Sequence, residues 1–151
     1  PMAQFDQKPG AGRRAWTDGW DGYPAARQRL LESVLYRKTS NPVVLGGDVH
    51  SFNASQLKLD FDDPASAVVA SEFVTTSITS QAWSQERLNQ YLPDNPHLLL
   101  ADSRFRGYGR VDVSAQRLQV DMRALATVQQ RDAATLASFV VEDGKPGPLR
   151  A

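Results

Sequence analysis

In the stretch Asn41-Pro42-Val43-Val44-Leu45-Gly46-Gly47-Asp48-Val49-His50-Ser51, a short apolar run rich in β-branched residues ends at two glycines. An aspartate and a histidine follow directly. Such a run is typical of a strand that is buried on both faces of a sheet and has parallel neighbours. It therefore predicts an α/β sheet with polar side chains at the carboxyl end of this strand.

A helix is predicted upstream of this strand, over residues 24–39. Proline suits the first helical position, as at Pro24, and an acidic residue such as Asp21 favours the N-terminal end of a helix. Apolar residues recur with helical spacing at Leu30, Leu31, Val34 and Leu35. The solvent-exposed side is expected to carry Arg27, Arg29, Glu32 and Arg37. Residues 1–20, which precede the helix, are rich in turn residues and read as a loop.

Mostly antiparallel strands are predicted downstream. The predicted strands are residues 57–62, 68–78, 98–101, 107–113, 118–125 and 138–142, with a short helix at 85–92 and a tail at 144–148. The fold class is thus α/β (α+β). One helix cannot cover both faces of a buried strand, so we expect the chain to be a piece of a longer protein.

Composition excludes several classes of protein. The chain has 151 residues, about one domain, and its 17 basic and 17 acidic residues leave a net charge of zero. This balance offers no patch for nucleic acid or an anionic membrane. No apolar run approaches the length of about 20 residues that a membrane span requires. Cysteine is absent, which excludes a disulfide scaffold and a thiol nucleophile within these residues.

Asp48 and His50 are the strongest candidates for chemistry. In an extended backbone they would project to the same side, with about 7 Å between their Cα atoms, and could bind one metal or straddle two. A carboxylate suits Ca²⁺ or Mg²⁺, whereas imidazole suits iron or zinc. The alternative is a turn closed by capping hydrogen bonds.

Other residues are weaker candidates. We expect His97 to be a hydrogen-bonded loop residue near the surface, and Arg106 to be a solvated loop residue; the alternatives are a substrate-pocket role and a phosphate contact. Glu72 lies in an apolar strand and is expected to pair with an arginine. Asp21 caps the helix or accepts a hydrogen bond from His50. Trp16 and Trp83 are expected to be packing residues.

Several motifs resemble the alkaline phosphatase D (PhoD-like) family, in the family's order and over nearly all of the chain. They are Trp20-Asp21-Gly22-Tyr23-Pro24-Ala25-Ala26-Arg27-Gln28-Arg29-Leu30-Leu31, residues 41–51, Ala70-Ser71-Glu72-Phe73-Val74, Thr76-Ser77-Ile78, Asn95-Pro96-His97, Arg106-Gly107-Tyr108 and residues 137–142. The resemblance implies a metallophosphoesterase-type sandwich of two mixed β-sheets flanked by helices, with residues 1–151 as the C-terminal portion of the catalytic domain.

The same resemblance implies metal-dependent hydrolysis of phosphate monoesters and diesters by a periplasmic or secreted enzyme. The implied ions are Fe³⁺ and Ca²⁺, with His50 on the iron and Asp48 facing a calcium.

The family's N-terminal ligand motifs and its cysteine ligand are absent from this sequence. We therefore expect the fragment alone to be inactive, with the remaining ligands supplied by the missing half. A related nuclease-like diesterase with other ions stays open. So does a non-catalytic β-rich binding or structural domain, in which Asp48 and His50 close a turn.

Overall fold

Two four-stranded β-sheets form the centre of the molecule in the computed structural model, which describes residues 1–151. The first sheet is mixed and has the order β1-β3-β2-β4, comprising β1 (Val43–Gly46), β2 (Phe52–Lys58), β3 (Val68–Val74) and β4 (Leu98–Asp102). The second sheet follows chain order and is antiparallel, with β5 (Arg106–Val113), β6 (Arg117–Leu125), β7 (Ala133–Glu142) and β8 (Leu149–Arg150).

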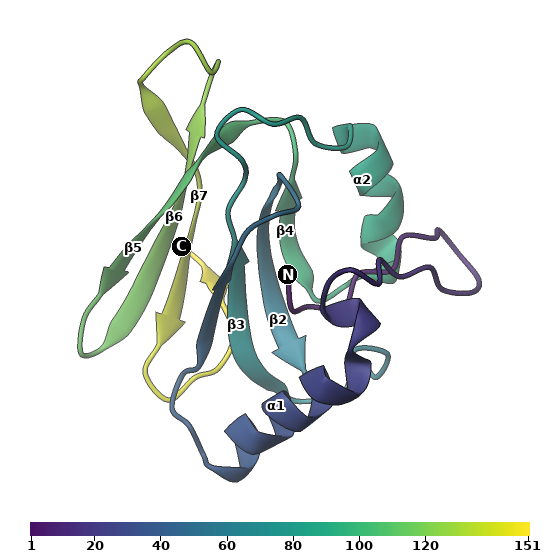
Figure 1. The fold of residues 1–151 in the computed structure, drawn as a ribbon. Helices are drawn as coiled ribbons and strands as arrows, with labels where there is room; N and C mark the ends of the chain where they lie inside the picture. The colour runs from purple at the N-terminus through teal and green to yellow at the C-terminus, as the bar shows by residue number, and fades with distance from the viewer.

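The helices lie on the side of the first sheet that faces away from the second sheet (Figure 1). They are α1 (Pro24–Tyr36) and α2 (Gln85–Tyr91), and the short 3-10 helices are η1 (Trp20–Gly22) and η2 (Leu92–Asp94). The side chain of Ser84 caps α2 by accepting a hydrogen bond from Arg87 N. The result is a layered α/β sandwich, the fold class that the sequence predicts.

Two hydrophobic clusters hold the layers together. The larger one joins the two sheets and contains Phe52, Ala54, Phe73, Val120, Met122, Ala124, Ala137, Phe139 and Val141. The smaller one lies under α1 and contains Met2, Ala3, Leu31, Leu57, Val69 and Ala70. The N-terminal segment, predicted to be a loop, thus contributes Met2 and Ala3 to the core.

Strand β1 is the edge of its sheet, which corrects one prediction. It pairs in parallel with β3, from Val43 opposite Ser71 to Gly46 opposite Val74. Its other edge has no partner strand, and Leu45 is 62% exposed. The apolar run therefore does form a strand with a parallel neighbour, but within this chain it is not buried on both faces.

Helix α1 also differs from its predicted faces. Arg27, expected in solvent, is only 5% exposed, whereas Leu30 and Leu35 are exposed. The reason is that its guanidinium pairs with Asp21, with 2.6 Å between Nη1 and Oδ1, and also donates to Met2 O at 3.0 Å. Leu31 is then the one fully buried leucine of this helix.

Several strand boundaries differ from the predictions. Strand β2 begins at Phe52 and ends at Lys58, so most of the predicted strand 57–62 lies in the following turn. Strand β3 ends at Val74, and β7 begins at Ala133 rather than at residue 138. The predicted tail is part of the fold, because Gly147 and Pro148 are buried and β8 pairs with β7. No helix has the length and apolarity that a membrane span requires.

Candidate active site

The turn after β1 carries Asp48 and His50 in an unusual backbone conformation. Both residues have positive φ, 79° for Asp48 and 57° for His50. The extended geometry expected from the sequence is therefore wrong here. A residue other than glycine in this region costs about 1–3 kcal/mol and persists only where its surroundings fix it, which is common at functional sites.

His50 is fixed at both its backbone and its ring. Its carbonyl oxygen accepts hydrogen bonds from Thr76 Oγ1 (2.9 Å) and Arg106 Nη1 (3.1 Å). Its ring Nδ1 lies 2.7 Å from the carbonyl oxygen of Gln81. Because a carbonyl oxygen can only accept, Nδ1 must carry the proton, and in the neutral ring Nε2 keeps its lone pair. A metal-ligating histidine has this arrangement, in which the second nitrogen is oriented by an acceptor.

Arg106 connects three loops around His50. Besides the His50 carbonyl, its guanidinium donates to Ser80 O (2.6 Å), to Ser77 Oγ (3.2 Å) and to Ser103 O. The expectation of a solvated loop arginine is therefore wrong. Burial lowers the pKa of Arg106, and the charge of Asp102 acts in the opposite direction.

A cavity of about 390 Å³ lies beside this turn and is lined by residues of the turn, of the first sheet and of the N-terminal segment. Its polar floor includes Asn53, Ser55 and Glu72 from β2 and β3. Asp48 and His50 lie at the same cavity, and Asp48 is exposed. The remaining walls are largely aromatic and apolar, and include Phe5, Trp16, Trp20, Trp83, Leu88 and Leu98.

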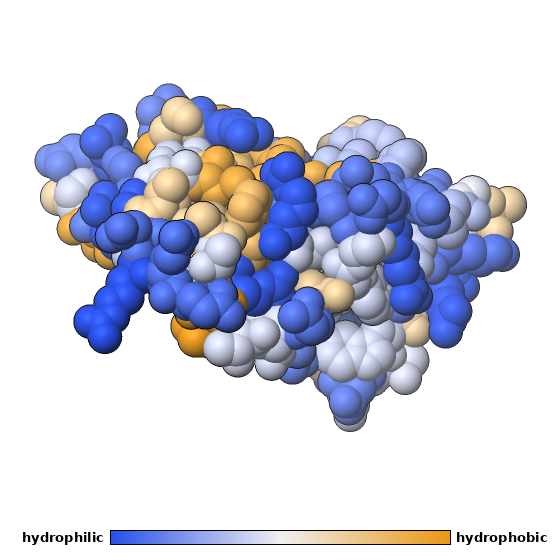
Figure 2. Space-filling model, turned by 90° about the horizontal axis from the view of Figure 1, so that it is seen from above, coloured by the Kyte–Doolittle hydropathy of each residue, from blue (hydrophilic) through white to orange (hydrophobic).

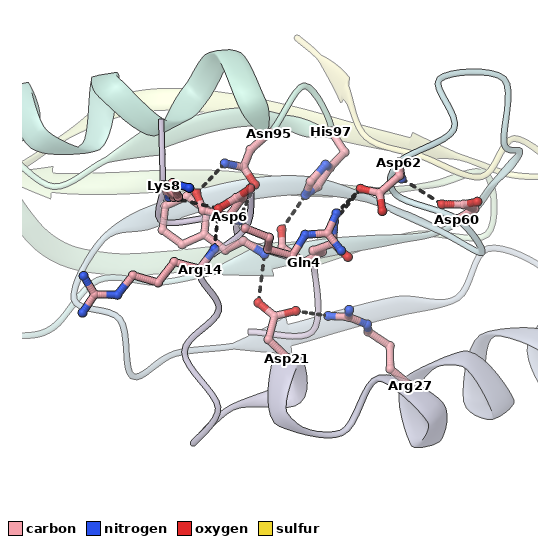
Figure 3. Close-up of polar contacts among 12 residues, drawn as sticks. Gln4, Asp6, Lys8, Arg14, Asp21, Arg27, Asp60, Asp62, Asn95 and His97 are labelled. Atoms are coloured by element: carbon pink, nitrogen blue, oxygen red, sulfur yellow. Dashed lines mark hydrogen bonds and ion pairs between the residues drawn. The ribbon is translucent and has the colours of Figure 1, made fainter. Parts of the chain in front are cut away.

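Asp21 helps to hold the N-terminal segment along this cavity. Asp21 accepts hydrogen bonds from Phe5 N (3.0 Å) and Arg27 Nη1 (2.6 Å), as Figure 3 shows. It thus neither caps α1 nor accepts from His50, which corrects both expectations. Asn95 adds a further anchor, because its side chain accepts from Asp6 N and donates to Asp6 O.

Glu72 is fully buried but does not pair with an arginine as expected. Its carboxylate accepts hydrogen bonds from the backbone amides of Met2 and Ala3. Burial raises the pKa of Glu72 above its usual range, while the two amides act to lower it. Its role is thus to bind the N-terminal segment to β3.

His97 is buried rather than near the surface, which corrects another prediction. Its Nε2 lies 2.6 Å from Gln4 O (Figure 3). Its ring packs edge-on against Phe61. The buried Nδ1 has no hydrogen-bond partner. Burial lowers the pKa of His97, so the neutral ring is favoured. These contacts make it a packing residue of the N-terminal segment.

The chain contains no group of three or more His, Cys, Asp or Glu side chains that could hold a metal ion. Asp48 and His50 offer two donors, a carboxylate and an imidazole nitrogen. Sequence reasoning identified these two residues but missed Thr76 and Gln81, which hold His50. Nothing local in the sequence reveals that residues 26 and 31 positions downstream contact one histidine.

Fold and site together define a class: an α/β sandwich with strained polar residues at the carboxyl end of a strand, where ligands of such sheets bind. A family model described as PhoD-like phosphatase matches residues 1–122. The chain belongs to the PhoD-like phosphatase family, which confirms the resemblance seen in the sequence.

Two relatives support this assignment. The chain is 38% identical to alkaline phosphatase D of Bacillus subtilis (strain 168) over 135 residues, which are 86% of this chain and 23% of that protein. A solved structure titled "Structure of PhoD" superposes with a TM-score of 0.88 at 35% identity, covering 100% of this chain and 30% of that one. The chain thus spans about a quarter to a third of the length of these relatives.

Proposed function

We propose that this chain supplies part of the active site of a metal-dependent phosphatase that hydrolyses phosphate monoesters and diesters. The observation that carries the proposal is the tautomer of His50. Its Nδ1 donates to Gln81 O at 2.7 Å, which leaves Nε2 free to bind a metal. Membership of the PhoD-like phosphatase family supports the reaction class.

The donor set fits the two ions that the family resemblance implies. The imidazole of His50 is a suitable ligand for Fe³⁺, and the exposed carboxylate of Asp48 for Ca²⁺. When bound, such ions activate water and neutralise phosphate oxygens. The residues of this chain hold the imidazole in one orientation and keep the carboxylate at the same cavity. The remaining ligands come from the part of the protein outside this chain.

The test is metal content, measured by mass spectrometry on the full-length protein. We expect iron and calcium in the wild type, loss of iron in His50→Ala and loss of calcium in Asp48→Asn. Hydrolysis of p-nitrophenyl phosphate should fall at least about 100-fold in both variants, because an incomplete site cannot activate water. The matched control is Asp132→Asn, an exposed carboxylate outside the cavity.

Unchanged iron in His50→Ala, or a metal-free wild type, would contradict the metal role. Asp48 and His50 would then close a turn in a non-catalytic β-rich domain.

We also propose a periplasmic or secreted location, on the family resemblance, to be tested by fractionating cells that express the full-length protein.

A further inference from the structure

The segment Gln81–Trp83 joins the candidate metal ligand to a group of aromatic rings. Gln81 accepts the hydrogen bond from His50, and Trp83 follows two residues later. The ring of Trp83 stacks on Phe5, with 6.1 Å between centroids and 29° between planes. Tyr91 packs edge-on against both rings, at 5.8 Å from each. The orientation of His50 and the position of this aromatic group therefore depend on the same short segment.

These rings leave an apolar surface open toward the cavity. Trp83 is 37% exposed and Trp16 is 39% exposed, and both line the same cavity of about 390 Å³. Large aromatic side chains around a concave site are typical of ligand pockets, whose volumes start at about 300 Å³. The guanidinium of Arg87 lies 4.5 Å from the Trp83 ring centre and holds one of its faces.

From this arrangement we propose that the aromatic end of the cavity binds the leaving group of the phosphate ester, and that it favours flat, uncharged aromatic groups. The inference rests on the proposed function, because the phosphate is placed at the Asp48 and His50 end. In the reaction, water attacks phosphorus and the bond between phosphorus and the leaving-group oxygen breaks. The attacking water gives up a proton and that oxygen takes one up, so an aromatic ester releases a phenol, whose ring suits an apolar site.

The charged groups around the cavity favour an uncharged leaving group at its aromatic end. The ionisable side chains lining the cavity are the carboxylates of Asp21, Asp48 and Glu72 and the imidazole of His50. No lysine or arginine side chain lines it, and the nearest guanidinium at the aromatic end, that of Arg87, is stacked on Trp83. An aromatic group instead gains contact with Trp16 and with the part of Trp83 that Phe5 and Arg87 leave exposed; aromatic pairs are worth about 0.5–1.5 kcal/mol beyond the area that they bury.

The test compares two substrates in the full-length protein: p-nitrophenyl phosphate, with an aromatic leaving group, and glycerol phosphate, with a polar one. In Trp83→Ala we expect KM for the aromatic substrate to rise about tenfold, with kcat changed less than threefold. KM for glycerol phosphate should stay within twofold. Trp83→Phe should restore most of the difference, because it keeps an aromatic face. The control is Tyr36→Ala, an aromatic residue 88% exposed on α1.

A second variant and a second measurement guard against misfolding and against failure of the proposed function. Trp16→Ala should show the same selective loss. Calorimetric binding of phenylphosphonate and methylphosphonate needs no turnover; the wild type should prefer the phenyl compound about tenfold, and Trp83→Ala should lose this preference.

An equal change for both substrates, or no preference for the phenyl compound, would overturn the inference. The aromatic end would then be filled by the rest of the full-length chain. A wild type without turnover of either substrate contradicts the proposed function, and the phosphonate preference still decides the inference.

Discussion

His50 shows how a single residue is set by contacts distant in sequence. Its positive φ of 57° is unfavourable by itself, yet Thr76, Gln81 and Arg106 each bind it. Hydrogen bonds of this kind contribute about 0.5–1.5 kcal/mol each, which is comparable to the backbone strain they offset. The tautomer that suits metal binding thus follows from the position of one carbonyl group.

His97 gives a prediction at the same scale. Burial lowers its pKa in the folded protein below the ordinary value of about 6.5. Below pH 6.5 the unfolded chain therefore binds a proton that the folded protein resists. Stability should fall as pH decreases from 6.5 toward the folded pKa, by at most about 1.4 kcal/mol per pH unit. In His97→Gln, whose amide can still donate to Gln4 O, this dependence should disappear.

The measurement is the free energy of unfolding of both proteins between pH 8 and pH 5. Lys58 and Arg27 act to lower the pKa of His97, and Asp21 acts to raise it. Glu72 has the opposite effect on stability, because its raised pKa makes the folded state bind a proton first as pH falls. The difference between wild type and variant isolates His97. An identical pH slope in both proteins would contradict the prediction.

At the scale of elements, Arg106 is the first residue of β5, and its side chain hydrogen-bonds to the turn after β1. The next residue, Gly107, has φ 155°, and a Cβ atom there would lie 1.9 Å from Arg123 O on β6. No other residue type fits at that position without moving the sheet. The close pairing of β5 with β6 therefore fixes the position of the Arg106 backbone. Four hydrogen-bond partners fix the position of its guanidinium group.

We predict that Arg106→Gln weakens metal binding in the full-length protein by about tenfold, since residues that orient a ligand commonly change affinity by 10–100-fold. Glutamine is too short to bridge the three loops. The measurement is iron retained against increasing chelator, with thermal stability recorded in parallel. Arg117→Gln, an exposed arginine on β6, is the control. Iron retention equal to that of the wild type would exclude this positioning role.

At the scale of the whole molecule, the two sheets depend on a shared core. Phe73 of β3 and Phe139 of β7 meet across the interface, with ring centroids 5.9 Å apart, and both are almost fully buried. The surface around the layers alternates between apolar patches and charged side chains, as Figure 2 shows from above. One apolar patch is on the side of the second sheet.

Replacing Phe139 with alanine should therefore destabilise the protein by about 3–5 kcal/mol, through lost burial and the cavity that remains. Urea unfolding of the full-length protein measures this effect. Tyr108→Ala, on β5 and half-exposed, should cost less than about 1 kcal/mol. A similar loss in both variants would mean that the interface between the sheets does not dominate stability.

The sequence by itself determined the elements and the family. The helical spacing of the apolar residues from Leu30 to Leu35 and the apolar run that ends at the glycines after Leu45 are local signals, and they predicted α1 and β1. The motif Gly47–His50 predicted a candidate site, because residue types and short spacing are enough to suggest ligands, and the metal role of Asp48 and His50 stays a prediction. The family could also be predicted from the sequence alone, and the match of the family model to residues 1–122 confirms it.

Only the tertiary structure decided where the remaining polar residues act. Arg27, Glu72 and His97 are buried where they hydrogen-bond to the N-terminal segment, many positions away in the sequence, and no local pattern encodes those partners. The same holds for β8, which forms because β7 offers a free edge. Backbone strain at Asp48 and His50 is likewise a long-range effect, since the contacts that impose it on His50 come from Thr76, Gln81 and Arg106, at least 26 residues away.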